Sequence, residues 1–232
     1  MPCRCLPVFV LAVLLLPGTA LAHDLWLASE GDGYLLQYGH RGGELLPLNA
    51  AKLKTIHCRQ KGGAMKDLAL RAGTPPTALQ IPGKCEAVTA FLYGGFYSLT
   101  PDGEKNQPRS QVPDAVRSWE SRQYAKWIDV HAQSATAPLG EEFEIVPASD
   151  LARAKQGDKA TFRILLHGKP AAGVALAMDH KVLGESDSKG EVRVRIRGAA
   201  FESVVASLRQ PLQSPDADTV VYEASLSFEV AR

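Results

Sequence analysis

His23 is the residue of this sequence whose chemistry depends most on its place in the chain. A basic start with Arg4, an apolar run over Leu6–Leu16 and the triplet Ala20-Leu21-Ala22 precede it. This is the layout of a secretory signal with an Ala-x-Ala cleavage site. Cleavage after Ala22 would give His23 a free α-amino group beside its imidazole. An α-amine and an imidazole ordinarily titrate at about pH 8 and about pH 6.5, so two such groups on one residue can chelate a metal ion around neutrality.

His40 is predicted to lie next to His23 across a β-hairpin. Two short runs rich in Leu, Trp and Tyr, Asp24–Ser29 and Tyr34–Tyr38, flank a loop with two glycines, which is a hairpin pattern. If the two runs pair along their whole length, His23 lies opposite His40, with Cβ atoms about 5 Å apart. Two imidazoles and one amine would then meet at one ion, as in a histidine brace. A register slip of one residue would move His40 to the other face and leave it a surface histidine.

His131 is the third candidate ligand. It lies in Trp127–Gln133, which reads as a strand with Trp127, Asp129 and His131 on one face. Such a face offers either one more ligand or a carboxylate that orients a ligand; a solvent-facing strand residue is the alternative. The remaining histidines are expected to serve packing or the solvated surface, away from the metal: His57, His167 and His180.

Cys58 and Cys85 are the two cysteines that stay after removal of the signal, since Cys3 and Cys5 lie within it. Two cysteines in an exported chain usually pair in an oxidising compartment. The closed loop of about 27 residues would stabilise the fold by roughly 3 kcal/mol on the entropy model. A metal site that uses these cysteines is the alternative. Neither Cys3 nor Cys5 sits at the cleavage point, so no lipid anchor is expected.

The elements that must position these residues are short β-type runs with little helical periodicity. In the first half we predict strands at Leu53–Cys58, Ala78–Ile81 and Ala87–Tyr93, then a loop over Ser98–Asp114 and a helix over Ala115–Ala125. In the second half six runs separated by turn signals read as strands: Phe143–Pro147, Ala160–Leu166, Val174–Met178, Glu191–Ile196, Ser203–Leu208 and Val220–Val230. The sequence thus predicts a mainly β protein with a signal peptide (1–22), a metal-binding N-terminal β domain (23–138) and a C-terminal sandwich of the immunoglobulin or transthyretin kind (139–232).

Two stretches near the start carry a family resemblance. The run His23-Asp24-Leu25-Trp26-Leu27, followed by Tyr38-Gly39-His40, resembles the start of the NikM/NikK-like periplasmic proteins associated with nickel and cobalt uptake. Downstream, the resemblance continues through Pro138–Pro147, Gly168–Val174 and the Asp187–Gly190 turn. It implies a two-domain β protein in the periplasm that handles Ni(II) or Co(II), with His23 and His40 as site residues. A membrane uptake transporter is the partner that it implies.

Copper is the alternative metal. Three or four nitrogen donors suit both Ni(II) and Cu(II), and the Irving–Williams order favours Cu(II), so a copper buffer or delivery protein is a second hypothesis. An amino-terminal square-planar site built on backbone amides is excluded, because it needs histidine at the third position, where Leu25 stands.

An enzyme is a third hypothesis, because a copper brace can activate oxygen beside aromatic residues such as Phe91, Tyr93, Phe96 and Tyr97. The sequence contains neither a Gly-x-Ser-x-Gly nor a His-Glu-x-x-His motif, and we expect a binding protein instead. A purely adhesive role would leave His23 without a use. The formal charge of +1, with lysine and arginine scattered along the chain, gives no reason to expect nucleic acid or an anionic membrane as partner.

Overall fold

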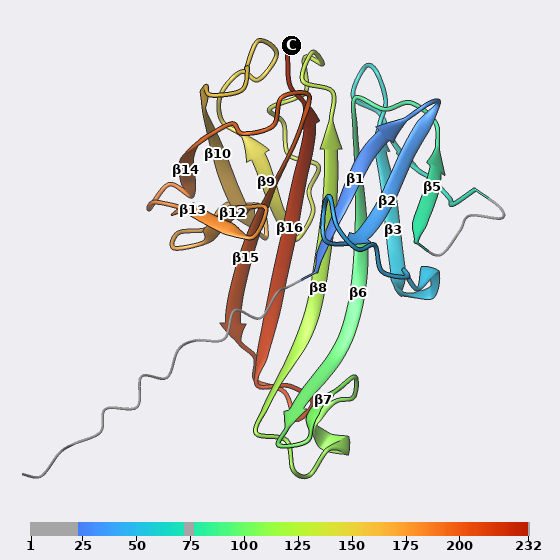
Figure 1. Cartoon of the computed structure of the whole chain (residues 1–232), viewed down its shortest axis with the longest axis vertical. Coiled ribbons are helices and arrows are strands. Elements are labelled where there is room, and N and C mark those ends of the chain that lie inside the picture. The colour runs from blue at the N-terminus through green and yellow to red at the C-terminus, as the bar shows by residue number, and fades with distance from the viewer. Residues whose placement is uncertain (1–22, 72–76, 232) are drawn as a thin grey trace, which may run out of the picture.

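The computed structural model describes residues 23–71 and 77–231, so the predicted signal peptide at 1–22 lies outside the described residues. Regular structure is almost all β-strand, which confirms the predicted fold class (Figure 1). Over these two ranges, no helix is long and apolar enough to cross a membrane. The elements in chain order are β1 Asp24–Glu30, β2 Gly33–Gly39, η1 Ala50–Lys52, β3 Leu53–Arg59, β4 Met65–Asp67, β5 Ala78–Pro82, β6 Ala87–Thr100, β7 Gly103–Lys105, η2 Arg109–Gln111, β8 Arg117–Ile128, β9 Phe143–Pro147, β10 Lys159–Leu166, β11 Lys169–Pro170, β12 Ala175–Met178, β13 Lys181–Glu185, β14 Glu191–Arg195, β15 Phe201–Pro211 and β16 Thr219–Glu229.

A nine-stranded sheet joins the two halves of the chain. Its order is β13-β12-β15-β16-β8-β6-β3-β4, with β7 paired to β6. The long strands β8 and β16 pair in parallel at its centre, as Figure 1 shows. Strands before and after the predicted boundary near residue 138 therefore belong to one continuous sheet.

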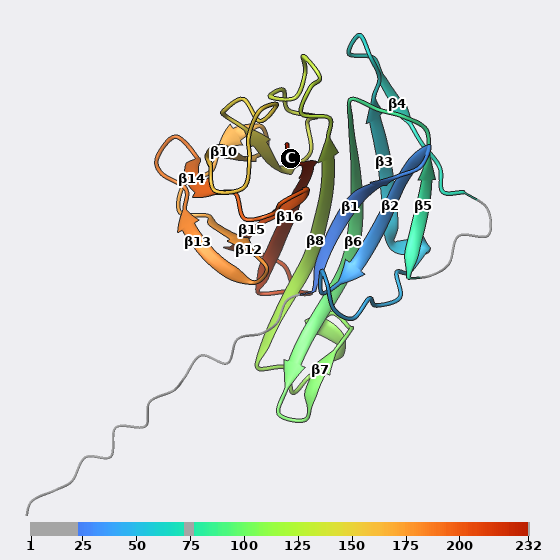
Figure 2. The ribbon, with the colours of Figure 1, turned by 45° about the horizontal axis from the view of Figure 1, so that its top comes forward.

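Two hydrophobic cores lie on either side of this shared sheet. One lies under the small sheet β1-β2-β5 and includes Leu27, Leu36 and Val88. The other lies between β9, β10 and β14 and the strands β12, β15 and β16, around Phe143 and Phe162. In Figure 2 the small sheet and the strands β10 and β14 stand on opposite sides of β8 and β16. The two halves thus have separate cores but a common sheet, which fixes the hairpin relative to the second half.

The predicted strands are present, and most extend beyond their predicted ends, except that the strand predicted over Trp127–Gln133 stops at Ile128, where β8 ends. The helix predicted over Ala115–Ala125 is wrong, because all of this segment from Arg117 on lies within β8. Strand β8 has a neighbouring strand on each side and a hydrophobic core on each face. Most of it is therefore buried, and its sequence shows no clear alternation of apolar and polar residues. The segment Ser98–Asp114 is not all loop either, since β6 runs to Thr100 and β7 pairs with it.

The predicted disulfide is present. Cys58 of β3 and Cys85, just before β6, are bonded with an S–S distance of 2.06 Å. The hydroxyl of Tyr34 donates to the carbonyl of Cys85 at 3.1 Å and accepts from its backbone N–H at 2.9 Å. The hairpin is therefore tied to the cross-linked part of the first core.

Candidate metal centre

The hairpin has the predicted register. Strand β1 pairs with β2 in antiparallel fashion from Glu30 and Gly33 to Asp24 and Gly39. One residue beyond the last pair, the rings of His23 and His40 lie with centroids 4.9 Å apart. The local sequence thus brings the two predicted donors together.

Gly39 shapes the chain next to His40. Its φ is +130°, and a Cβ added there would lie 2.4 Å from the backbone oxygen of Glu44. The amide of His40 donates to the same oxygen at 2.9 Å, closing a short loop after β2. A larger residue at position 39 would therefore displace the loop that holds His40.

His180 is the third imidazole of the cluster, and no sequence pattern indicates that it lies there. Its Nε2 lies 3.1 Å from Nδ1 of His40, and the two ring centroids are 5.0 Å apart. The predicted turn at His180 is present. The expectation that His180 lies away from the candidate metal ligands is wrong, because its ring lies against that of His40. His180 comes from the β12–β13 turn, 140 positions along the chain from His40, so no local pattern links the two residues.

Charged groups surround the three imidazoles. Oδ2 of Asp24 lies 4.0 Å from Nδ1 of His180. Burial raises the pKa of the Asp24 carboxyl, while the nearby His180, His40 and Arg41 act in the opposite direction. Arg41 donates to Asp179 at 2.6 Å. Asp24 therefore places a partly buried carboxyl group beside His180.

The spacing of the imidazoles suits one ion. Imidazole nitrogens bind Zn(II) at about 2.0–2.1 Å, so two donors 3.1 Å apart would subtend about 100° at the metal. Within residues 23–71 and 77–231, no group of three or more His, Cys, Asp or Glu side chains already has the full spacing of a metal site. The nitrogens of His40 and His180 lie within reach of one ion, and a site that also includes His23 would require its ring to move.

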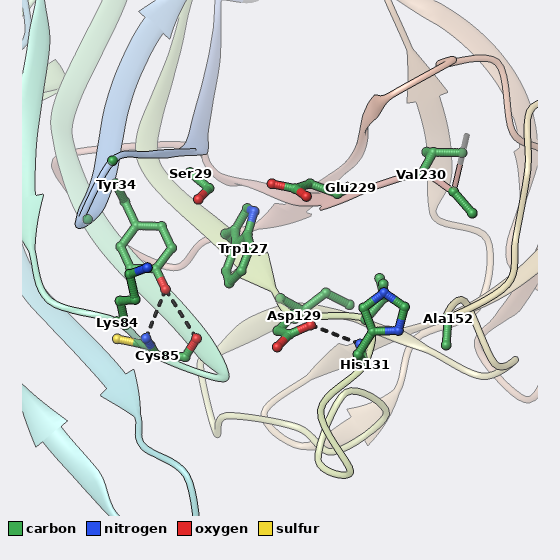
Figure 3. Close-up of a pocket in the computed structure, with 15 residues that line it drawn as sticks. Ser29, Tyr34, Lys84, Cys85, Trp127, Asp129, His131, Ala152, Glu229 and Val230 are labelled. Carbon is green, nitrogen blue, oxygen red and sulfur yellow. Dashed lines mark hydrogen bonds between the residues drawn. The ribbon is translucent and has the colours of Figure 1, made fainter.

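His131 does not join this cluster. Strand β8 ends at Ile128, and Asp129 Oδ1 accepts the backbone N–H of His131 at 2.9 Å in a turn. Trp127, Asp129 and His131 do share one environment, a pocket of about 400 Å³ beside the hairpin turn (Figure 3). That turn is the far end of β1 from His23, about 20 Å away for a strand of this length. We therefore do not count His131 among the donors of the cluster.

The other histidines have different partners. His57 Nδ1 lies 2.8 Å from Asp67 Oδ1, between β3 and β4. His167 Nε2 lies 3.8 Å from Glu142 Oε1 in the second half. Neither contact involves the three clustered histidines, so both residues serve as references for substitutions at the cluster.

Comparison with known proteins places the chain in a family. The family described as a domain of unknown function (DUF4198) matches residues 20–201, and the chain belongs to it. No curated protein matches the sequence. Among solved structures, the N-terminal four Ig domains of Dscam1 isoform 9.44 match 90% of this chain at 14% identity with a TM-score of 0.25. The chain spans 41% of the length of that structure, and a likeness of this degree carries no functional argument.

Proposed function

We propose that this protein binds one divalent transition-metal ion outside the cytoplasm, through the α-amine and imidazole of His23 and the imidazole of His40. The contact between the two rings, at 4.9 Å, is the observation that carries the proposal. This distance supports a histidine brace because the pairing of the hairpin alone brings the two rings together. Cleavage after Ala22 would add the α-amine at the same point.

Within this proposal, the protein captures Ni(II) or Co(II) in the periplasm and passes it to a membrane uptake transporter. The resemblance of His23–Leu27 and Tyr38–His40 to NikM/NikK-like proteins supports this role. The site is also partly open, since the side chain of His180 beside it is 30% exposed. A carrier that hands its ion to a partner needs such access, and we propose a binding protein rather than an enzyme.

Copper delivery or buffering is the second candidate function. The donors assigned from the hairpin are all nitrogens, and such a set binds Cu(II) more tightly than Ni(II) under the Irving–Williams order. The family resemblance is what favours nickel and cobalt.

Calorimetric titration of the chain that begins at His23 tests the proposal. Ni(II), Co(II), Cu(II) and Zn(II) would be titrated separately into the protein with its disulfide intact. We expect one ion per chain, with Ni(II) bound more tightly than Co(II). Absence of binding by all four ions at micromolar concentrations would refute the proposal.

A further inference from the structure

We infer that His180 is a third imidazole ligand of this metal site, carried to it by a turn from the second half of the chain. The inference rests on the proposed function and extends it, because it adds a donor that neither the hairpin nor the family resemblance indicates. The ion would then bridge the β1–β2 hairpin and the β12–β13 turn.

The orientation of the His180 ring supports a ligand role. Its Nε2 faces His40 Nδ1 at 3.1 Å, and its Nδ1 faces the carboxylate of Asp24 at 4.0 Å. Metal-bound histidines commonly turn their second ring nitrogen toward a carboxylate, which fixes the tautomer and the ring orientation. An ion between His40 and His180 would replace the proton that their two nitrogens share, and Asp24 would face the remaining N–H of His180.

The β12–β13 connection is a tight two-residue turn. Strands β12 and β13 pair at Met178 and Lys181, and the two residues between them have positive φ, 48° at Asp179 and 61° at His180. Asparagine, aspartate and glycine are the usual residues at such positions, and histidine is also enriched there. The tight turn therefore holds His180 in one backbone conformation next to the hairpin loop.

Arg41 fixes the turn against the hairpin. Its guanidinium donates to Asp179 at 2.6 Å, lies 3.6 Å from the fully buried carboxylate of Glu202, and stands 5.8 Å above the ring of Phe201. Two neighbouring residues of the loop after β2, His40 and Arg41, thus engage two neighbouring residues of the turn. Arg41 is a positioning residue that keeps His180 at the site before an ion arrives.

The added donor changes the chemistry of the site. The α-amine and imidazole of His23 with His40 and His180 form a set of four nitrogens. Such a set suits the tetragonal coordination of Cu(II) and Ni(II). It can also form without a second protein chain, so we expect the isolated monomer to bind the ion at full affinity.

Two matched substitutions test the inference, His180→Asn and His167→Asn. Both residues have positive φ, 61° and 51°, and asparagine tolerates this conformation, so neither substitution strains the turn. Calorimetry with Ni(II) measures affinity, and electron paramagnetic resonance with Cu(II) counts coordinated nitrogens. For His180→Asn we expect the affinity for Ni(II) to fall by about 100-fold, which is at or beyond the largest losses seen on removing residues that only orient a ligand. The Cu(II) spectrum should show one coupled nitrogen fewer. For His167→Asn we expect no change.

The outcomes separate this inference from the proposed function. Equal affinity and an unchanged nitrogen count in His180→Asn would overturn the ligand role of His180 and leave the hairpin site standing. Failure of the unsubstituted protein to bind any ion would instead refute the proposed function, and the inference would fall with it. A loss of affinity in His167→Asn equal to that in His180→Asn would also overturn the inference, because the effect would not be specific to the site.

Discussion

Replacing His40 with alanine is expected to weaken Ni(II) and Cu(II) binding more than any other single side-chain substitution. His40 contacts both other imidazoles, with ring centroids 4.9 Å from His23 and 5.0 Å from His180. Its removal therefore deletes one donor and the contact that holds the others together. We expect a loss on the order of 1,000-fold, about 4 kcal/mol of binding free energy, measured by competition against a chelator of known affinity.

His57→Ala is the matched control for this substitution. His57 pairs with Asp67 on β3 and β4 and has no contact with the three clustered histidines. We expect its metal affinity to equal that of the unsubstituted protein. A His40→Ala protein that stays folded and binds Ni(II) at undiminished affinity would show that the hairpin end is not the site.

Replacing Lys126 with methionine is expected to lower the free energy of unfolding by about 3–5 kcal/mol. Lys126 Nζ lies 2.6 Å from Glu144 Oε1, and only 4% and 3% of the two side chains are exposed. Glu144 also accepts the backbone N–H groups of Leu139 and Gly140 at 2.7 and 3.1 Å. Loss of the lysine would leave a buried carboxylate without its cation, at the point where β8 meets the start of the second half. Urea unfolding measures the change.

Two further variants make this prediction specific. Arg163→Met removes the partner of Glu191 in an ion pair whose arginine side chain is 47% exposed, and such pairs contribute about 0–1 kcal/mol. The double variant Lys126→Met with Glu144→Gln removes both buried charges and keeps a side-chain oxygen for the N–H groups of Leu139 and Gly140, so it should recover most of the lost stability. Equal stability of Lys126→Met and Arg163→Met would contradict the burial argument.

The hairpin could be predicted from the sequence because its determinants are local. Two apolar runs around the Gly31 turn fix the pairing of β1 with β2, and the pairing fixes His23 opposite His40. The disulfide was predictable for a similar reason, since the sequence predicts an exported chain with two remaining cysteines, and these allow one intramolecular pairing. Both inferences needed no knowledge of the remaining topology.

The third imidazole could not be predicted in this way. His180 reaches the hairpin because β16 pairs in parallel with β8 and β12 follows through β15, and strand order across a nine-stranded sheet has no short-range signal. Strand β8 is buried on both faces because it lies at the centre of the sheet, so apolar and polar residues do not alternate along it. Its first part therefore resembles a helix in the sequence. His131 was placed on a strand because Asp129 was read as a strand residue, whereas its side chain forms a turn with the backbone of His131.

The most direct test of the metal site compares the chain that begins at His23 with one that carries a single extra alanine before it. Both proteins keep every side chain of the cluster and differ only in whether the amine of His23 is free. We predict that the extended chain binds Ni(II) and Cu(II) at least about 100-fold more weakly, because it lacks one donor of the chelate. Equal affinity of the two proteins would contradict the central claim that the amino terminus of His23 binds the metal.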